Sequence, residues 1–103
     1  MSNGIAFYVT FHLKPECVEE WKEAAIKVLN TVYKEDTFIA CYMHRDAEDT
    51  NKFTLYERWN EPSRQAFLKK QFEAKSYLKE YEERLPDMLQ CPRAIVFLEL
   101  PHE

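Results

Sequence analysis

Apolar and polar residues alternate over residues 5–13, and this is the period of a β-strand whose two faces differ. The apolar set occupies every second position: Ile5, Phe7, Val9, Phe11 and Leu13. Pro15 follows at once, and proline suits the first turn of a helix because its missing N–H would have no helical partner there. The pattern predicts a strand that passes directly into a helix.

From residue 16 the apolar period changes to three or four residues, which is typical of an amphipathic helix. The apolar positions are Val18, Trp21, Ala25, Val28 or Leu29, and Val32. Glu16, Glu19 and Glu20 favour a helix N-terminus at this point, because carboxylates stabilise the positive end of the helix dipole. We expect a helix over about 16–34 with Glu and Lys on its outer face.

Two runs rich in β-branched and aromatic residues follow, over 38–45 and 53–59, and a polar, turn-forming segment joins them. These runs predict a β-hairpin. The approach to its first strand passes through Glu35, Asp36 and Thr37, and the only glycine of the chain is Gly4, so this turn must form without glycine.

Cap-forming residues and Pro62 precede a second helical pattern over about 62–84. One face of this helix carries Phe67, Gln71, Ala74, Leu78 and Tyr81. Pro86 is expected to end the helix, and a last strand is expected over 93–100.

The order of strand, helix, strand, strand, helix and strand predicts a single ferredoxin-like α+β domain over 1–103, with two helices on one face of a four-stranded antiparallel sheet. The strands look apolar on both faces. In the second strand we expect Phe38, Ala40 and Tyr42 on one face and Ile39, Cys41 and Met43 on the other. Two helices cover one side only, so we expect a homodimer to cover the second side, with the C-terminal tail or another partner as the alternatives.

Composition narrows the classes of partner. Hydrophobic residues make up 46% of the 103 residues, which suffices for a core, and the net charge of −4 with no basic stripe argues against a nucleic-acid partner. Three separated cysteines, interpreted as small buried hydrophobic residues, favour a reducing, cytoplasmic location. No secretory leader pattern and no apolar stretch near 18 residues is present, so no membrane association is expected.

The hairpin region resembles the antibiotic-biosynthesis-monooxygenase family in Asp46, Asp49, Phe53, Tyr56, Glu57 and Trp59. The opening strand running into Lys14 and Pro15, and the segment from Leu85 to Pro92, also match the outline of that family. The resemblance implies a dimeric α+β barrel that oxidises quinol-like or polyketide aromatics with oxygen and without a metal or flavin cofactor. It covers nearly the whole chain.

A cofactor-free oxygenase needs a dry apolar pocket and a polar group that stabilises the substrate anion. Trp59, Tyr42, Phe67 and Tyr77 are candidate pocket walls for substrate binding, His44 is the candidate base, and Glu57 and Gln71 are candidate assisting groups. The alternatives are structural. Trp59 can be a core residue, Glu57 a surface carboxylate paired with a neighbouring cation, and His44 an exposed histidine.

Two departures from the family pattern bear on activity. Many members carry histidines on the second helix where this chain has Gln71 and Ser76. Residues 62–84 therefore contain no histidine that could ligate haem iron, and the three histidines of the chain lack metal-ligand spacing. We expect a cofactor-independent monooxygenase acting on a small aromatic or quinol-type substrate. The alternatives are a non-catalytic dimeric small-molecule-binding module and an isomerase of a small carbonyl compound.

Overall fold

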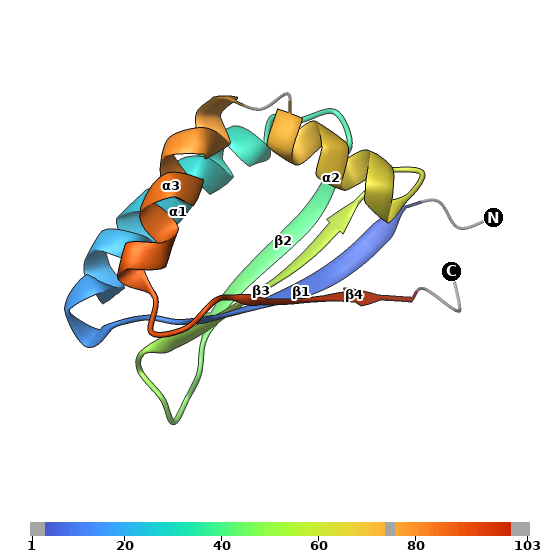
Figure 1. Ribbon diagram of the computed structural model, residues 1–103. Helices are drawn as coiled ribbons and strands as arrows, with labels where there is room; N and C mark the ends of the chain where they lie inside the picture. The colour runs from blue at the N-terminus through green and yellow to red at the C-terminus, as the bar shows by residue number, and fades with distance from the viewer. Residues whose placement is uncertain (1–3, 74–75, 100–103) are drawn as a thin grey trace.

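The computed structural model describes residues 4–73 and 76–99 and has the predicted ferredoxin-like α+β fold (Figure 1). Its sheet has the strand order β2-β3-β1-β4, and every neighbouring pair is antiparallel. The strands are β1 (Ile5–His12), β2 (Phe38–Arg45), β3 (Lys52–Trp59) and β4 (Ala94–Leu98). The first and last strands of the described chain, β1 and β4, are therefore neighbours, and β1 lies in the interior of the sheet between β3 and β4.

All the helices lie on one side of the sheet (Figure 1). They are α1 (Val18–Val32), α2 (Arg64–Glu73) and α3 (Lys79–Met88), and single 3-10 turns, η1 (Pro15–Cys17) and η2 (Ser76–Leu78), precede α1 and α3. Among the described residues no helix has the length and apolar character needed to cross a membrane. The first helix matches its prediction closely.

The second predicted helix is wrong in its extent, because the segment forms α2 and α3 as separate helices. Pro86 lies inside α3 and does not end it at residue 84. So close to a helix C-terminus a proline removes few hydrogen bonds, and the burial of Leu85 and Met88 favours continuing to Met88. The last strand is also shorter than predicted, and the predicted positions of Ala74 and Leu100 lie outside the described residues.

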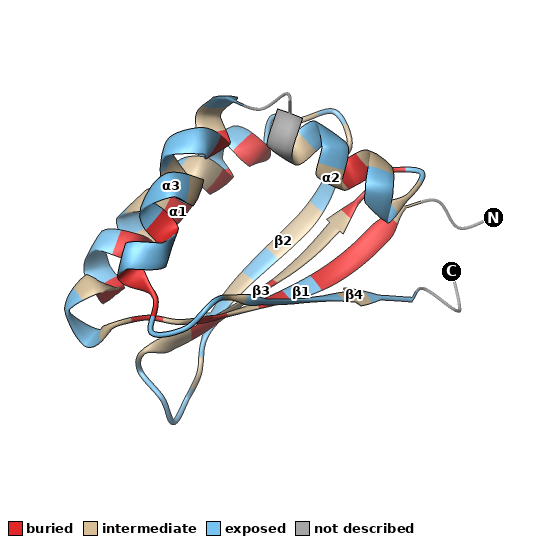
Figure 2. Ribbon diagram, viewed as in Figure 1, coloured by how far each residue is buried: buried red, intermediate tan, exposed pale blue. Residues whose placement is uncertain are grey.

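The core lies between the helices and the inner face of the sheet, which is the face that the helices cover (Figure 2). The apolar positions predicted for the first strand are buried from Ile5 to Phe11 in β1 and at Leu13 just after it, and Ala6 at the start of the strand is buried as well. α1 contributes its predicted apolar face through Val18, Trp21, Ala25, Leu29 and Val32. Trp21 packs between Phe11 and Phe53 with ring centroids 4.9 and 5.0 Å apart, so this helix is firmly seated on the sheet.

A β-bulge in β2 changes which of its residues face the helices. Phe38 pairs with Trp59 and Ala40 pairs with Arg58, so the register skips Ile39. Phe38 consequently shares the inner face with Cys41 and Met43, and the prediction that it shares a face with Ala40 and Tyr42 is wrong. An alternation argument cannot detect one extra residue inside a strand.

The outer face of the sheet, which no described element covers (Figure 1), carries exposed apolar side chains from three strands. Tyr8 is 40% exposed, Tyr42 58%, Val96 53% and Leu98 41%. Tyr42 also stacks on Tyr56 of β3 with ring centroids 6.4 Å apart. The expectation of a second apolar face is confirmed in this part of the chain.

Backbone geometry confirms the expectation about glycine. α1 ends in tight turns at Tyr33, Lys34 and Glu35, and no described residue other than glycine has a positive φ. Gly4 has φ 127°, and a Cβ there would lie 2.6 Å from the Trp59 carbonyl oxygen. Gly4 is therefore required where β1 begins beside the end of β3.

A buried carboxylate anchors the start of α2. Glu61 is 1% exposed, accepts a hydrogen bond from the Thr37 hydroxyl at 2.5 Å and pairs with the Lys70 ammonium at 3.1 Å. These contacts tie the loop before α2 to the segment before β2 and to α2 itself. The position of α2 over the sheet is thereby fixed, and with it the residues that α2 presents inward.

Candidate functional site

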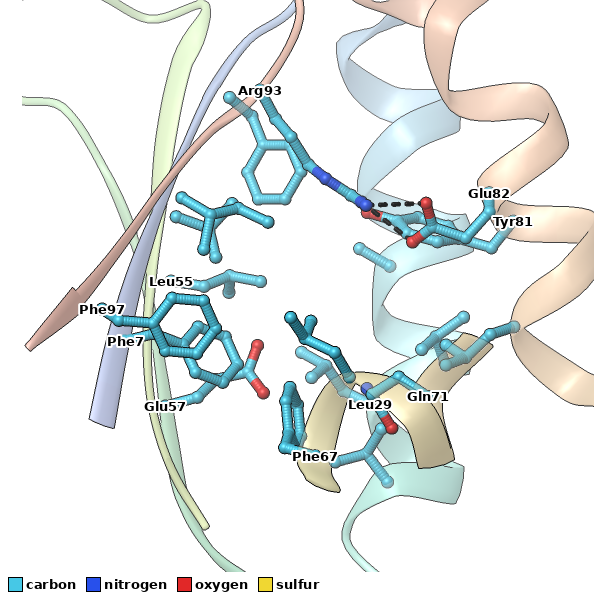
Figure 3. A pocket seen from close by; sticks show the side chains of 18 residues that line it. Phe7, Leu29, Leu55, Glu57, Phe67, Gln71, Tyr81, Glu82, Arg93 and Phe97 are labelled. Atoms are coloured by element: carbon cyan, nitrogen blue, oxygen red, sulfur yellow. Dashed lines mark hydrogen bonds and ion pairs between the residues drawn. The ribbon is translucent and has the colours of Figure 1, made fainter. Parts of the chain in front are cut away.

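A cavity of about 100 Å³ lies between the inner face of the sheet and the helices (Figure 3). The sheet contributes Phe7 and Val9 of β1, Leu55 and Glu57 of β3, and Phe97 of β4. These residues are two apart within β1 and within β3, because alternate side chains of a strand point to the same face. The wall is apolar except for one carboxylate.

The helices supply the opposite wall through Val28 and Leu29 of α1, Phe67 and Gln71 of α2, and Tyr81 of α3. The Phe67 ring lies 5.2 Å from the Phe7 ring. Apolar and aromatic walls with a few polar groups are typical of small-molecule sites. Ile95 also lines the cavity and is 40% exposed, so the cavity opens to solvent along β4.

Glu57 is held in place by its neighbour on the same face of β3. The Trp59 indole Nε1 donates a hydrogen bond of 2.9 Å to Oε1 of Glu57. Trp59 is fully buried, with its ring centroid 5.4 Å from that of Phe38 and 5.2 Å from that of Phe67. A donor locked by packing on two sides fixes the carboxylate at the cavity wall.

Gln71 supplies the second polar group at this end of the cavity, from the helix side (Figure 3). Its side-chain oxygen is buried and has no hydrogen-bond partner among the described residues. A buried unpaired acceptor costs about 1–3 kcal/mol. A bound molecule that carries a hydroxyl or an N–H could relieve this cost.

An ion pair crosses the other end of the cavity (Figure 3). The Arg93 guanidinium donates two hydrogen bonds to Glu82 of α3, at 2.8 and 2.7 Å. Such a bidentate pair has a fixed geometry. It ties the chain just before β4 to α3 and compensates the positive charge of Arg93.

Tyr81 lies beside this pair and turns its hydroxyl toward α1, where it accepts a hydrogen bond of 3.1 Å from Trp21 Nε1. Burial is the main cause that raises the pKa of Tyr81 to about 12. The phenol therefore stays neutral at ordinary pH.

The structure brings together three of the residues singled out in the sequence, Glu57, Phe67 and Gln71. Trp59 is a core residue behind Phe67 and does not line the cavity, so its predicted role as a pocket wall is wrong. Tyr77 lies outside the cavity in a groove between α1 and α3, and its hydroxyl donates to Glu35. Burial and this acidic partner raise the pKa of Tyr77.

Tyr42 and His44 lie on the outer face of the sheet and do not meet Trp59 and Gln71. They pair with Tyr56 and Thr54, whose neighbours Leu55 and Glu57 point to the inner face. Because successive side chains of a strand point to opposite faces, the sheet lies between these two residues and the cavity. The prediction that they share one cavity with Trp59 is therefore wrong. A role for His44 as a base stays a prediction about the outer face.

Sequence reasoning missed Glu82, Arg93 and Tyr81 as cavity residues. Glu82 and Arg93 are eleven residues apart and meet only because the chain turns back after α3. No local spacing signals such a pair. For Tyr81 the sequence offered one signal, its position on the predicted apolar face of the second helix, and that signal predicted a core residue.

The cysteines differ in environment. Cys41 is half-buried on the inner face opposite Glu57, and burial, with a smaller contribution from that carboxylate, raises its pKa to about 12. Cys91 is exposed, so its interpretation as a buried hydrophobic residue is wrong. In the described ranges no group of three or more His, Cys, Asp and Glu side chains could hold a metal ion.

Comparisons with solved structures agree with this architecture. Rv0793 of Mycobacterium tuberculosis aligns with a TM-score of 0.84 at 18% identity, covering 98% of both chains. A conserved protein of Methanosarcina mazei aligns with 0.81 at 20% identity over 94% of this chain and 92% of its own. A mutant of SnoaB, a cofactor-independent oxygenase from Streptomyces nogalater, aligns with 0.80 at 11% identity over 99% and 97%. At such identities the likeness shows the fold alone.

The sequence match is more specific. No curated protein matches the chain, but the family model described as antibiotic biosynthesis monooxygenase matches residues 5–84. The matched region includes three strands, the cavity carboxylate Glu57 and the cavity amide Gln71. The chain therefore belongs to the antibiotic biosynthesis monooxygenase family.

Proposed function

We propose that this protein is a cofactor-independent monooxygenase that oxidises a small aromatic, quinol-type molecule in the cavity between sheet and helices. The observation that carries the proposal is the Glu57 carboxylate, which Trp59 holds at the wall of an otherwise aromatic and aliphatic cavity. Membership of the family supports it. So does the likeness to SnoaB, whose name states this kind of reaction for that protein.

A hydroquinone can supply every electron that the reaction needs. Oxygen takes four electrons: one of its atoms replaces a ring hydrogen and becomes part of a hydroxyquinone, and the other leaves as water. The two hydroxyl hydrogens and the one hydrogen of the oxidised ring position are redistributed, one to a hydroxyl of the hydroxyquinone and two to water. The balance closes with the substrate and oxygen alone.

Glu57 is the proposed proton acceptor. A phenol that has given an electron to oxygen becomes strongly acidic, so a weak base such as a carboxylate can then take its proton. Trp59 is the positioning residue, because its Nε1 fixes one carboxylate oxygen. Gln71 accepts a second hydrogen bond from the ring substituents, and the apolar walls limit the water around the reduced oxygen species.

A homodimer is the second part of the proposal, with the outer faces of two sheets packed together. Exposed Tyr8, Tyr42, Val96 and Leu98 supply the apolar surface, and a two-fold arrangement lets one patch cover the other. His44, the base proposed from the sequence, would in that case act only on a molecule bound between the two copies. The free cysteines fit a reducing, cytoplasmic location.

Oxygen uptake by the purified protein with a panel of hydroquinones and anthrone-type compounds tests the function. We expect uptake above the rate without protein for at least one compound. Glu57→Gln should lower the rate by about 100-fold, within the range for loss of a general base. His44→Ala is the matched comparison and should retain the rate. Loss of activity in His44→Ala with retention in Glu57→Gln would move the site to the outer face. Uptake equal to the blank throughout would leave a binding module or an isomerase.

A further inference from the structure

The α2 helix is the cavity wall that is seated least firmly on the sheet. Of the α2 side chains that the structure describes, Phe67 alone is fully buried, whereas α1 buries five residues along one apolar face and α3 buries two. α1 and α3 also pack side by side, while α2 lies over a different part of the sheet (Figure 1). Because packing of an apolar face supplies most of the stability of a helix in a protein, α2 should leave the sheet at the lowest cost.

An ion pair holds α2 in its described position. The Lys70 ammonium, near the end of α2, reaches back to the carboxylate of Glu61, at 3.1 Å from Oε1 and 3.2 Å from Oε2. Glu61 precedes the helix, is 1% exposed and also accepts a hydrogen bond from the Thr37 hydroxyl, so it is anchored to the segment before β2. The Lys70 side chain is 53% exposed. Water can therefore solvate the ammonium as the pair parts, and the helix need not unfold.

A second contact links the first turn of α2 to the cavity wall. The Arg64 guanidinium lies 5.0 Å from the centroid of the Phe97 ring, which lines the cavity from β4. Arg64 is exposed, and a cation–π contact at an exposed site contributes little. It helps to orient α2 and opposes its movement only weakly.

The cavity is smaller in this position than a ring-shaped ligand requires. Its volume is about 100 Å³, and an engineered apolar cavity of about 150 Å³ holds one benzene molecule. A ring held wholly inside therefore requires one wall to move outward. The wall that moves at the lowest cost is α2, which contributes Phe67 and Gln71 (Figure 3).

We propose that α2 is a lid on the cavity, hinged at residues 62–63 and latched by the ion pair between Glu61 and Lys70. With the latch closed, the Phe67 ring packs against Trp59 with ring centroids 5.2 Å apart. When Lys70 separates from Glu61, α2 swings away as an intact helix and opens the cavity from the helix side. The lid governs access to the cavity whatever molecule enters and whatever reaction follows.

Thiol labelling measures how often the lid opens. In a protein whose three natural cysteines are changed to alanine, Gln71→Cys introduces a thiol that faces the cavity from α2, and Gln65→Cys introduces one at an exposed position of the same helix. Ellman's reagent is larger than the closed cavity, so the Gln71→Cys thiol should react at least about 100-fold more slowly than the Gln65→Cys thiol, at a rate set by opening. Equal rates would show that α2 does not close and would overturn the lid. Should Gln71→Cys fail to fold, Leu68→Cys in the same cavity wall replaces it as the reporter.

Leu85→Ala distinguishes labelling through the lid from labelling through global unfolding. Leu85 is a buried residue of α3 that does not line the cavity, so the lid can open without disturbing its packing. Leu85→Ala should leave the labelling rate of the Gln71→Cys thiol within about twofold, whereas a route through global unfolding would be accelerated about 30-fold or more. Should Leu85→Ala fail to fold, low concentrations of urea make the same distinction, because a lid that opens as a helix exposes little surface. Acceleration by either treatment to the extent of global unfolding would overturn the lid.

Two lysine variants test the latch itself. Lys70→Met removes the ammonium that pairs with Glu61 and should accelerate labelling of the Gln71→Cys thiol about tenfold. Lys69→Met makes the same change at the neighbouring, exposed lysine and should alter the rate less than about twofold. Equal effects of the two changes would refute the latch. Neither a substrate nor oxygen is needed for labelling, so its outcome does not depend on whether the protein is a monooxygenase.

Discussion

The two faces of the sheet use different aromatic residues, although the same strands form both. Phe7 faces inward and is buried, whereas its neighbour Tyr8 faces outward and is 40% exposed. The same division holds for Phe53 on the inner face and for Tyr42 and Tyr56 on the outer face. Phenylalanine has no polar atom to satisfy and suits a dry cavity, while tyrosine combines apolar area with a hydroxyl that can remain hydrated. The inner face is suited to apolar packing, and the outer face combines apolar area with groups that can remain hydrated.

Truncating one aromatic ring on each face is the most direct test of the difference between the two faces. We expect Phe7→Ala to lower the free energy of unfolding by about 3–5 kcal/mol, because it removes a ring packed against Phe67 and Phe97. Tyr8→Ala should cost less than about 1 kcal/mol at protein concentrations where a dimer is dissociated. Urea unfolding followed by circular dichroism measures both. Similar costs for the two variants would show that the faces do not differ in this way.

The outer face is tested next by adding a charge to its exposed apolar surface on β4. Val96 pairs with Tyr8 across β1 and β4 and is 53% exposed. Val96→Asp should weaken self-association by about 100-fold or more, because a carboxylate at an apolar interface loses its hydration without a partner. Sedimentation velocity over a range of concentrations gives the dissociation constant.

Thr50→Asp is the control for this experiment, since it adds the same charge in the exposed hairpin loop. It should leave self-association unchanged. Equal weakening by the two variants would indicate a general effect of charge. A native protein that stays monomeric at high concentration would refute the dimer itself.

Much of the fold could be predicted because its signals are local. The alternation from Ile5 to Leu13 and the helical period of α1 each specify a buried face within a few residues. The extra residue at Ile39 and the division of the second helix could not be predicted in this way. The extra residue at Ile39 leaves the composition of β2 unchanged. The division of the helix depends on which residues of α2 and α3 pack against the sheet.

The candidate site was only half predictable for a related reason. Glu57, Phe67 and Gln71 lie at inward positions of regular elements, so their periodicity placed them correctly. Tyr42 and His44 are equally regular, but alternation says which residues share a face and not which face bears the cavity. The ion pair between Arg93 and Glu82 depends on a chain reversal after α3, and no pattern in the sequence predicts that these two residues meet.

A subtler comparison concerns the two buried tryptophans, whose indole N–H groups have different acceptors. Trp59 donates to the Glu57 carboxylate, and Trp21 donates to the Tyr81 hydroxyl. Hydrogen bonds to charged groups contribute more than neutral ones. We expect Trp59→Phe to destabilise the protein by about 1 kcal/mol more than Trp21→Phe, although both lose a similar ring area. Thermal and urea unfolding of the two variants check this, and the opposite order would mean that Trp59 does not hold the carboxylate.

The smallest effect, a chemical one without change of stability, should distinguish the cysteine of the inner face from the one in the loop before β4. The thiolate is the reactive form of cysteine, and burial together with Glu57 raises the pKa of Cys41 from 9.0 to about 12. Its thiolate fraction at pH 8 is therefore lowered about 1,000-fold.

The rates of labelling by a disulfide reagent such as Ellman's test this difference in a protein that carries Cys17→Ala. Exposed Cys91 should react first, and Cys41 should react at least about 100-fold more slowly. Because thiolate increases with pH up to the pKa, the slow rate should rise about tenfold per pH unit from 8 to 10. Glu57→Gln removes the carboxylate and should accelerate Cys41 while leaving Cys91 unchanged, whereas equal rates for the two thiols at pH 8 would contradict the inward position of Cys41.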